Sequence, residues 1–272
     1  DPHIRGSEII GYDYMTVETP GKLQYLDIQN TTWRASAYSS FIIKGCFCPD
    51  PYPSDHIKAM PAMGDNVFWR LSNLRKIVLP NWMPIGGRLF ADCNNLTSVN
   101  IPEGVTSIDV RAFEGCSSLT SVNIPEGVTS IGWGAFAGCS SLTSVNIPEG
   151  VTSIGNRAFA NCSSLTSVDI PEEVTEIGEA AFKNCTDLYS IHLSSQMTSI
   201  ESETFAGCKN LRSLNIPSSI TRIEADFCKG SAIKYLFFNN PSTPPKLEVD
   251  VTLKDFFRFI VIVPDGSYDT YL

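Results

Sequence analysis

The stretch Leu119-Thr-Ser-Val-Asn-Ile-Pro-Glu-Gly-Val-Thr-Ser-Ile131 also stands, unchanged, at residues 96–108 and 142–154. A looser copy occupies residues 165–177, and an Ala-Phe-x-x-Cys segment follows each copy, which sets a period of 23 residues. One such unit is too short to bury its own apolar side chains, so neighbouring units must cover one another. The repeat therefore predicts a stacked solenoid rather than a chain folded back into a globule.

Within one unit, the alternation of polar and apolar residues predicts a strand from which Ser121 and Asn123 point outward. Pro125 ends this strand because proline cannot donate a hydrogen bond to a ladder. We expect a second short extended segment and then a single helical turn before the next unit begins. The side chains expected to face a common core are Leu119, Val122, Ile124, Val128, Ile131, Ala135, Phe136 and Cys139.

One phenylalanine marks each unit and shows where the array begins and ends. We expect about eight units of 22–23 residues within residues 65–238, with residues 1–64 as an N-terminal capping region and residues 239–272 as a C-terminal cap. The first and last units match the repeat poorly, as terminal repeats often do. The marking residues are Phe68, Phe90, Phe113, Phe136, Phe159, Phe182, Phe205 and Phe227.

The two capping regions carry weaker signals. Thr19-Pro20 resembles a helix start, with Thr19 as N-cap and Leu23 and Leu26 on one face. Residues 41–45 suggest a short strand, and Ser54 is the expected N-cap of a second helix. Near the other end, residues 260–263 are a run of Ile and Val that predicts a closing apolar strand.

The overall charge disfavours some partners. The 272 residues carry a net charge of −9 with no basic cluster, which disfavours a nucleic acid. No apolar run reaches the length of about 18 residues that a membrane-spanning helix needs. No signal peptide is visible at Asp1, which leaves both a cytoplasmic protein and an exported, trimmed protein open.

Most of the nine cysteines follow the repeat, which argues against disulfides and zinc sites. A cysteine at one fixed place per unit is a packing position for a small apolar side chain. Cys46 and Cys48 lie outside the repeats and flank Phe47, and we interpret them as free or weakly redox-active. The cysteines expected to be free and buried are Cys93, Cys116, Cys139, Cys162, Cys185 and Cys208.

The motif Leu-x-x-Val-x-Ile-Pro-x-x-Val-x-x-Ile-Gly-x-x-Ala-Phe-x-x-Cys, recurring over about residues 68–238, resembles the BspA-like leucine-rich repeat family. The resemblance implies an α/β fold, namely a right-handed, curved leucine-rich-repeat solenoid with a parallel sheet on its concave side. It also implies a bacterial protein that is extracellular or at the cell surface and takes part in adhesion or host interaction. The family has no shared catalytic residues. Ser194 and Ser195 replace Pro-Glu and Glu201 replaces glycine, so we expect a looser turn there.

Two features are candidate binding sites. Trp133 lies in a turn that varies between units, where an exposed side chain can be a contact hot spot, although such a turn also tolerates drift. An outward-facing polar column can bind sugar hydroxyls or peptide backbone, or it can simply keep the sheet face soluble. The residues of this column are Asn100, Asn123, Asn146, Asp169, His192 and Asn215.

Two further groups have simpler explanations. Ser190, His192 and Asp169 share one sheet face, but Ser190 and His192 lie two apart on one strand, roughly 7 Å between Cβ atoms, and a flat sheet supplies no oxyanion hole. A column of carboxylates could hold a cation or face a basic partner, but an acidic stripe copied with the repeat needs no such role. Its members are Glu103, Glu126, Glu149 and Glu172.

The sequence thus predicts a binding scaffold that is not an enzyme, with no catalytic residues and no cofactor or metal site. Its expected ligand is a protein or a glycan held on the sheet face or at the turn edge. The alternative is a structural spacer module with no ligand of its own.

Overall fold

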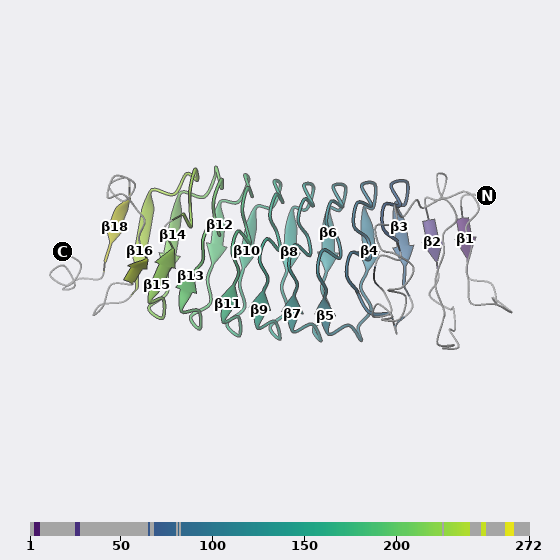
Figure 1. The fold of residues 1–272 in the computed structure, drawn as a ribbon, viewed down its shortest axis with the longest axis horizontal. Helices are drawn as coiled ribbons and strands as arrows, with labels where there is room; N and C mark the ends of the chain where they lie inside the picture. Colours follow the sequence, from purple (N-terminus) through teal and green to yellow (C-terminus); the bar gives the residue numbers. More distant parts are fainter. Residues whose placement is uncertain are drawn as a thin grey trace, which may run out of the picture.

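The protein is a stack of short parallel strands that runs along the long axis of the molecule (Figure 1). The computed structural model describes residues 3–5, 25–27, 65, 68–79, 81, 83–224, 226–239, 246–248 and 259–263. Each repeat adds one strand to each of two ladders, and successive partners lie 22 or 23 residues apart over most of the stack, as in the pairs Lys76–Ser98 and Ser121–Ser144. The solenoid predicted from the repeat is confirmed.

The first ladder carries the Ser-Val-Asn strands, in which the central residue faces the core. In β6, Val122 is buried between the exposed side chains of Ser121 and Asn123, as the alternation predicts. Its strands are β1 (His3–Arg5), β2 (Tyr25–Asp27), β3 (Lys76–Val78), β4 (Ser98–Asn100), β6 (Ser121–Asn123), β8 (Ser144–Asn146), β10 (Ser167–Asp169), β12 (Ser190–His192), β14 (Ser213–Ile216), β16 (Tyr235–Phe238) and β18 (Ile260–Ile262).

The second ladder forms where the chain turns back after the proline of each unit. From β5 to β15, its short strands place one isoleucine per unit into the core, as Ile131 does in β7. Its strands are β5 (Ser107–Ile108), β7 (Ser130–Ile131), β9 (Ser153–Ile154), β11 (Glu176–Ile177), β13 (Ser199–Ile200), β15 (Arg222–Glu224) and β17 (Lys246–Glu248).

A column of phenylalanine rings fills the space on the turn side of these ladders. Phe136 and Phe159 lie with ring centroids 5.4 Å apart and nearly parallel, and the same stacking continues from Phe68 to Phe205. These rings are fully buried and belong to one core shared by all described units. Since each ring is covered mainly by rings of adjacent units, the units stabilise one another rather than themselves.

The prediction of a helical turn in each unit is wrong, because the backbone hydrogen bonds of this segment are not those of a helix. Among the described residues no helix is present, and the segment around Phe136 is a chain of tight turns. Backbone N–H groups alternate in direction: Cys139 donates back to Phe136 at 3.1 Å, whereas Phe136 donates forward to Ala158 of the next unit at 2.8 Å. Half of the backbone bonds in this segment therefore join one unit to the next.

The alternation depends on two residues per unit with left-handed backbone. Gly138 has a φ of 75°, and other units place Asn161 or Asn184 in the same conformation. The other position holds Gly134, but Ala180 and Arg157 also adopt it, with φ near 57°. Asparagine and glycine tolerate this region, whereas alanine and arginine are strained by roughly 1 kcal/mol. The stack therefore accepts some local strain to keep its interunit bonds.

The helix predicted from Thr19-Pro20 is also wrong over its described part. Tyr25–Asp27 forms β2, which pairs in parallel with Lys76–Val78 of β3 on one side and with β1 on the other. The unpaired backbone groups of an edge strand favour such an addition over a local helix. The strand predicted at 41–45, the helix predicted from Ser54, and Cys46 and Cys48 lie outside the described residues.

The repeat cysteines are free and buried, as predicted. Each thiol donates a weak hydrogen bond to the carbonyl oxygen of the phenylalanine in the preceding unit, for example from Cys139 to Phe113 at 3.2 Å. Burial, with smaller contributions from neighbouring thiols, raises the pKa of Cys139 well above its usual value. Burial likewise raises the pKa of Cys162 to about 12. Cys228 is a further buried cysteine that the repeat register did not predict.

Candidate functional site

The polar column predicted from the sequence forms one continuous exposed file on the first ladder. Asn100, Asn123 and Asn146 are exposed and stand directly opposite one another on β4, β6 and β8. Asp169 and His192 are exposed and paired in the same way on β10 and β12. Asn215 is exposed on β14, which packs beside β12. The structure therefore brings all six candidate residues onto one face, about one strand spacing apart.

Two members of this file also have structural partners. The side-chain oxygen of Asn100 accepts a hydrogen bond from the backbone N–H of Leu79 at 3.1 Å, so it helps to hold the preceding unit. His192 lies 3.7 Å from Glu172, and both side chains are more than half exposed. Their contact is weak because solvent screens an exposed ion pair. Asn100 therefore has a structural role besides its exposed position in the file.

The face does not assemble the parts of a hydrolase. The imidazole of His192 lies beside the carboxylate of Glu172. Asp169 of β10 stands opposite His192 of β12, whereas Ser190 lies two residues before His192 on the same strand. Among the described residues, no group of three or more His, Cys, Asp and Glu is placed to hold a metal ion. The described part of the chain also has no helix long and apolar enough to cross a lipid bilayer.

The acidic column differs from one carboxylate to the next. Hydrogen bonds from the hydroxyl and then the N–H of Ser195, followed by the nearby His192, lower the pKa of Glu172. Slight desolvation and then the neighbouring carboxylate of Glu173 raise the pKa of Glu149, with Glu126 adding to the effect. The column is therefore an exposed, mutually repelling stripe, relieved at Glu172 by its own hydrogen bonds.

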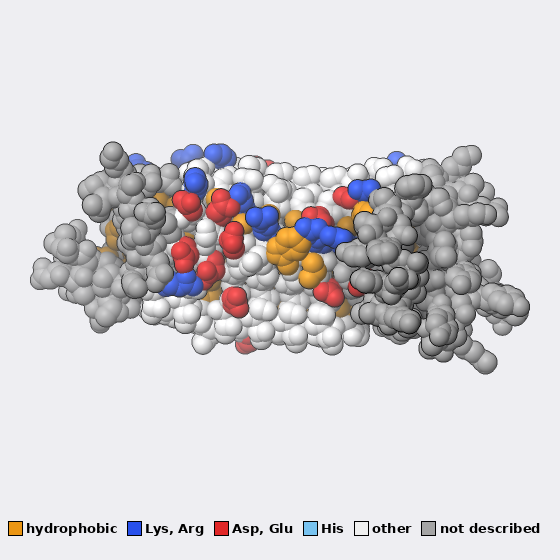
Figure 2. All heavy atoms as spheres, in the orientation of Figure 1, with side chains coloured by type: hydrophobic (Ala, Val, Ile, Leu, Met, Phe, Trp, Pro, Cys, Tyr) orange, Lys and Arg blue, Asp and Glu red, His pale blue; other side chains and the backbone are white. Residues whose placement is uncertain are grey.

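Trp133 is half-buried rather than exposed, which corrects the expectation from the sequence. The guanidinium carbon of Arg111 in the preceding unit lies 4.0 Å from the centroid of its ring, a cation–π contact that covers one face of the indole. The adjacent Val110 is 41% exposed. We call the surface formed by the turns that hold Val110 and Trp133, and by their equivalents in other units, the turn face. Figure 2 shows apolar and basic side chains near the middle of this face and acidic side chains toward its C-terminal end.

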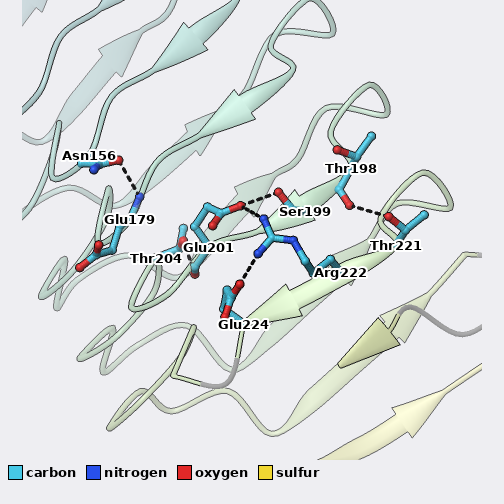
Figure 3. A network of polar contacts seen from close by, with 9 residues as sticks. All are labelled: Asn156, Glu179, Thr198, Ser199, Glu201, Thr204, Thr221, Arg222 and Glu224. Atoms are coloured by element: carbon cyan, nitrogen blue, oxygen red, sulfur yellow. Dashed lines mark hydrogen bonds and ion pairs between the residues drawn. The ribbon is translucent and has the colours of Figure 1, made fainter. Parts of the chain in front are cut away.

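The acidic part of this turn face is internally paired. Arg222 of β15 donates to Glu201 at 2.5 Å and also contacts Glu224, and the hydroxyl of Ser199 donates to Glu201 at 2.6 Å (Figure 3). Lys183 pairs with Glu203 at 2.5 Å nearby. Two cations thus pair with three carboxylates, so most of the charge in this region is engaged in contacts within the protein.

The departures from the repeat at 194, 195 and 201 are compensated by side chains. Glu201 lies in the network around Arg222, and Ser195 donates to Glu172 from both its N–H at 2.9 Å and its hydroxyl at 2.5 Å. Ser194 is fully buried, and its hydroxyl donates to the carbonyl of Glu172 at 2.9 Å. These bonds hold the turn that the loss of proline and glycine was expected to loosen.

Sequence reasoning missed one feature of the first ladder. At its C-terminal end, large side chains replace the small Thr and Ser residues that stand beside the file: Tyr189 is 62% exposed and Tyr235 is 36% exposed. Arg212 and Lys234 are exposed at equivalent places in the two units after Tyr189. The signal was present, because these residues interrupt the Thr and Ser columns of the earlier units, but a search for similarity between units passes over such interruptions.

The chain was compared with protein families and with solved structures. The model described as the BspA-type leucine-rich repeat region matches in six copies over residues 61–188 and 129–244. A leucine-rich repeat protein of T. pallidum is 33% identical, with a TM-score of 0.50, over 51% of this chain and 67% of that protein. A comparison with curated proteins gave no match.

A second solved structure, a leucine-rich repeat protein of Eubacterium ventriosum, is 25% identical with a TM-score of 0.56. The match covers 62% of this chain and 56% of that protein, so the chain spans little more than half of its length. Both matches are leucine-rich repeat proteins, in agreement with the stacked parallel strands.

Proposed function

Because the chain belongs to the BspA-type leucine-rich repeat family, we propose that it is a binding scaffold that holds a protein or glycan on the exposed face of its first ladder. One observation carries this proposal: the file from Asn100 to Asn215 is exposed and aligned strand by strand. Amide and hydroxyl groups at fixed spacing suit the repeated hydroxyl groups of a glycan or the backbone of an extended peptide.

The rigidity of the sheet beneath the file supports the same proposal. The backbone groups of β6 are engaged with β4 and β8, so the file is presented by side chains on an ordered sheet. A site on rigid strands loses little entropy when it binds its ligand. Binding can therefore be appreciable although each single polar contact is weak.

We further propose that the protein is not an enzyme and acts outside the cell or at its surface. Catalysis needs unlike groups that converge on one reacting atom, and the file instead repeats similar groups along a line. The surface location rests on the family resemblance. Labelling intact cells of the source organism with an antibody against the purified chain tests this location, and a signal seen only after lysis would contradict it.

The binding proposal is tested with the purified chain on arrays of glycans and extracellular-matrix proteins. A saturable hit should weaken when Asn123 and Asn146 are replaced by alanine, because these two are adjacent exposed amides of the file. Asn94→Ala is the matched control, since Asn94 is exposed in the loop before β4 and outside the file. Loss of binding in the control as well would rule out a site on the file.

Trp133→Ala distinguishes the two faces. If this variant loses the hit and the Asn123 and Asn146 variants keep it, the ligand lies on the turn face instead. If no ligand on either array is retained, the alternative of a spacer module is favoured. That alternative has its own support, because three units share an identical stretch of thirteen residues, as a spacer of adjustable length would.

A further inference from the structure

The C-terminal end of the first ladder carries most of the exposed apolar side chains that the structure describes. Of six exposed large hydrophobic residues among the described residues, five lie on or beside β12, β16 and β18, at the left of Figure 1. Single exposed apolar residues are common, but a cluster of them on one surface indicates an interaction site. The five are Tyr189, Tyr235, Ile260, Val261 and Ile262; Val261 lies opposite the buried Leu236, so it does not share the outer face of the sheet with the other four.

Tyr235, Ile260 and Ile262 continue two outward-facing columns of the first ladder, the polar file itself and the serine column beside it. Ser213 of β14 lies opposite Tyr235 of β16, and Tyr235 lies opposite Ile260 of β18. In the second column, Asn215 is followed by Phe237 and Ile262 in the same way. The face thus changes from small and polar to aromatic and aliphatic within three adjacent strands.

Two cations border this apolar region. Arg212 precedes β14, and Lys234 precedes β16 and donates its backbone N–H to the carbonyl of Arg212 at 2.9 Å. The ammonium of Lys234 lies 5.5 Å from the centroid of the Tyr235 ring. Tyr189 occupies the position equivalent to Arg212 in the preceding unit. Its N–H donates to the carbonyl of Thr166, the last threonine of the threonine column.

The charges of these two cations are available to a ligand. Neither Arg212 nor Lys234 forms an ion pair with any side chain within the described ranges, whereas Lys183 and Arg222 on the turn face are both paired. Asp169 of the file and Glu172 of the acidic column lie on the N-terminal side of Tyr189, as does the exposed Asp187 in the loop before β12. An anion would therefore be held at the C-terminal end, on a protein whose net charge is −9.

Building on the proposed function, we propose that this end of the sheet is a subsite for acidic sugar units of an anionic polysaccharide. Tyrosine rings offer flat apolar surfaces that suit the C–H face of a sugar ring and keep a polar edge. The guanidinium of Arg212 can bind a carboxylate or sulfate through two parallel hydrogen bonds. Ser190, Ser213 and Asn215 supply exposed groups for the remaining sugar hydroxyls.

The geometry favours a polysaccharide over an acidic peptide. The strands are spaced by about 4.8 Å, close to the rise of one sugar unit along an extended chain, so a polysaccharide that crosses the strands meets one column residue per unit. The contacts would fall in turn on Tyr189, Arg212 and Lys234. An extended peptide would instead favour pairing along a strand edge, for which these side chains are not required.

The test measures binding of the full chain to two anionic polymers, heparin and polygalacturonate, with neutral dextran as the uncharged comparison. Tyr189→Ala should weaken binding to the anionic polymers roughly tenfold, as expected for the loss of one aromatic anchor. The double variant Arg212→Gln with Lys234→Gln should abolish measurable binding. Arg157→Gln is the control for loss of a positive charge elsewhere on the surface, because Arg157 is exposed on the turn face and has no ion pair with a described side chain.

Saturable binding that is weakened in Tyr189→Ala, lost in the double variant and kept in Arg157→Gln supports the subsite. An equal loss in Arg157→Gln would overturn it, because general charge attraction would then explain the binding. Equal binding of poly-L-glutamate would also overturn it in favour of an acidic peptide. If the anionic polymers do not bind while another array ligand is lost through Asn146→Ala, the subsite fails and the proposed function stands.

Discussion

The Sγ atom of Cys139 lies 3.2 Å from the carbonyl oxygen of Phe113 in the preceding unit. The same contact recurs through six units, from Cys93 with Phe68 to Cys208 with Phe182. The thiol is small enough to pack in the core and still offers a weak donor to a carbonyl there. This explains why a cysteine, rather than an alanine or a valine, occupies the position.

The repeat thiols should be inert in the folded protein. Burial raises the pKa of Cys162 and Cys208 to about 12, so the reactive thiolate is scarce at pH 8. We expect the six repeat cysteines to resist a maleimide reagent until denaturant unfolds the chain. Peptide mapping by mass spectrometry follows each site separately. Fast labelling of Cys139 or Cys162 in the native protein would contradict the packing assignment.

Removing one ring from the phenylalanine column should open the stack locally. Phe159 lies 5.4 Å from Phe136 and 5.4 Å from Phe182, measured between ring centroids. Phe159→Ala should lower the free energy of unfolding by about 3–5 kcal/mol, because it leaves a cavity between its neighbours. Hydrogen exchange should rise first in the units that contain Phe136 and Phe182. The milder Phe159→Leu is the control, and a uniform rise along the chain would argue against nearest-neighbour coupling.

Two glycines test how closely the units approach. A Cβ added at Gly178 would lie 2.6 Å from the backbone nitrogen of Asn156, so the backbone must shift. A Cβ at Gly134 would meet nothing closer than 3.4 Å, although its φ of +62° strains any other residue. Gly178→Ala should therefore cost about 3 kcal/mol and Gly134→Ala about 1 kcal/mol. Chemical denaturation compares the two, and similar losses would contradict the close approach at Gly178.

Neighbouring glutamates of one column should respond to pH in opposite ways. The folded state lowers the pKa of Glu172, so its charged form stabilises the fold above about pH 4.3 and this stabilisation is lost as the pH falls through the lowered pKa. The folded state raises the pKa of Glu149, so its charged form destabilises the fold until protonation relieves it.

Glu172→Gln should therefore lower the melting temperature at pH 7, and Glu149→Gln should raise it. Thermal unfolding from pH 7 down to about pH 3 measures both differences. The effect of Glu149→Gln should fade first on acidification, because its pKa is the higher of the two. Shifts of the same sign at pH 7 would rule out this view of the column.

Most of the fold could be predicted from the repeat period. A fixed period fixes which residues must face the core, and the buried Val122 and Ile131 and the exposed Asn123 lie where the period predicts. The period also placed the six polar candidates on one face. Local patterns served less well at Thr19-Pro20, where pairing of Tyr25–Asp27 with β3 overrode a helix signal.

Contacts between side chains of different units could not be read from the period. Nothing in the sequence near Trp133 shows that Arg111 covers its ring, because that contact depends on the rotamers of two units. The compensation of Glu201 by Arg222 likewise joins residues that are 21 positions apart. The patch around Tyr189 and Arg212 was hidden for a different reason, because it consists of departures from the repeat.

The three identical stretches have a consequence for the length of the molecule. Because the strand of Val122 pairs with an identical strand at Val145, removing 23 residues from this part should leave the strand pairing between the identical stretches unchanged, although the turns that differ between units would meet new neighbours. Each removal should shorten the stack by about 4.8 Å. The number of central repeats therefore sets the length of the stack. Gain or loss of repeats by recombination within the gene would change the distance between the Tyr189 region and the opposite end.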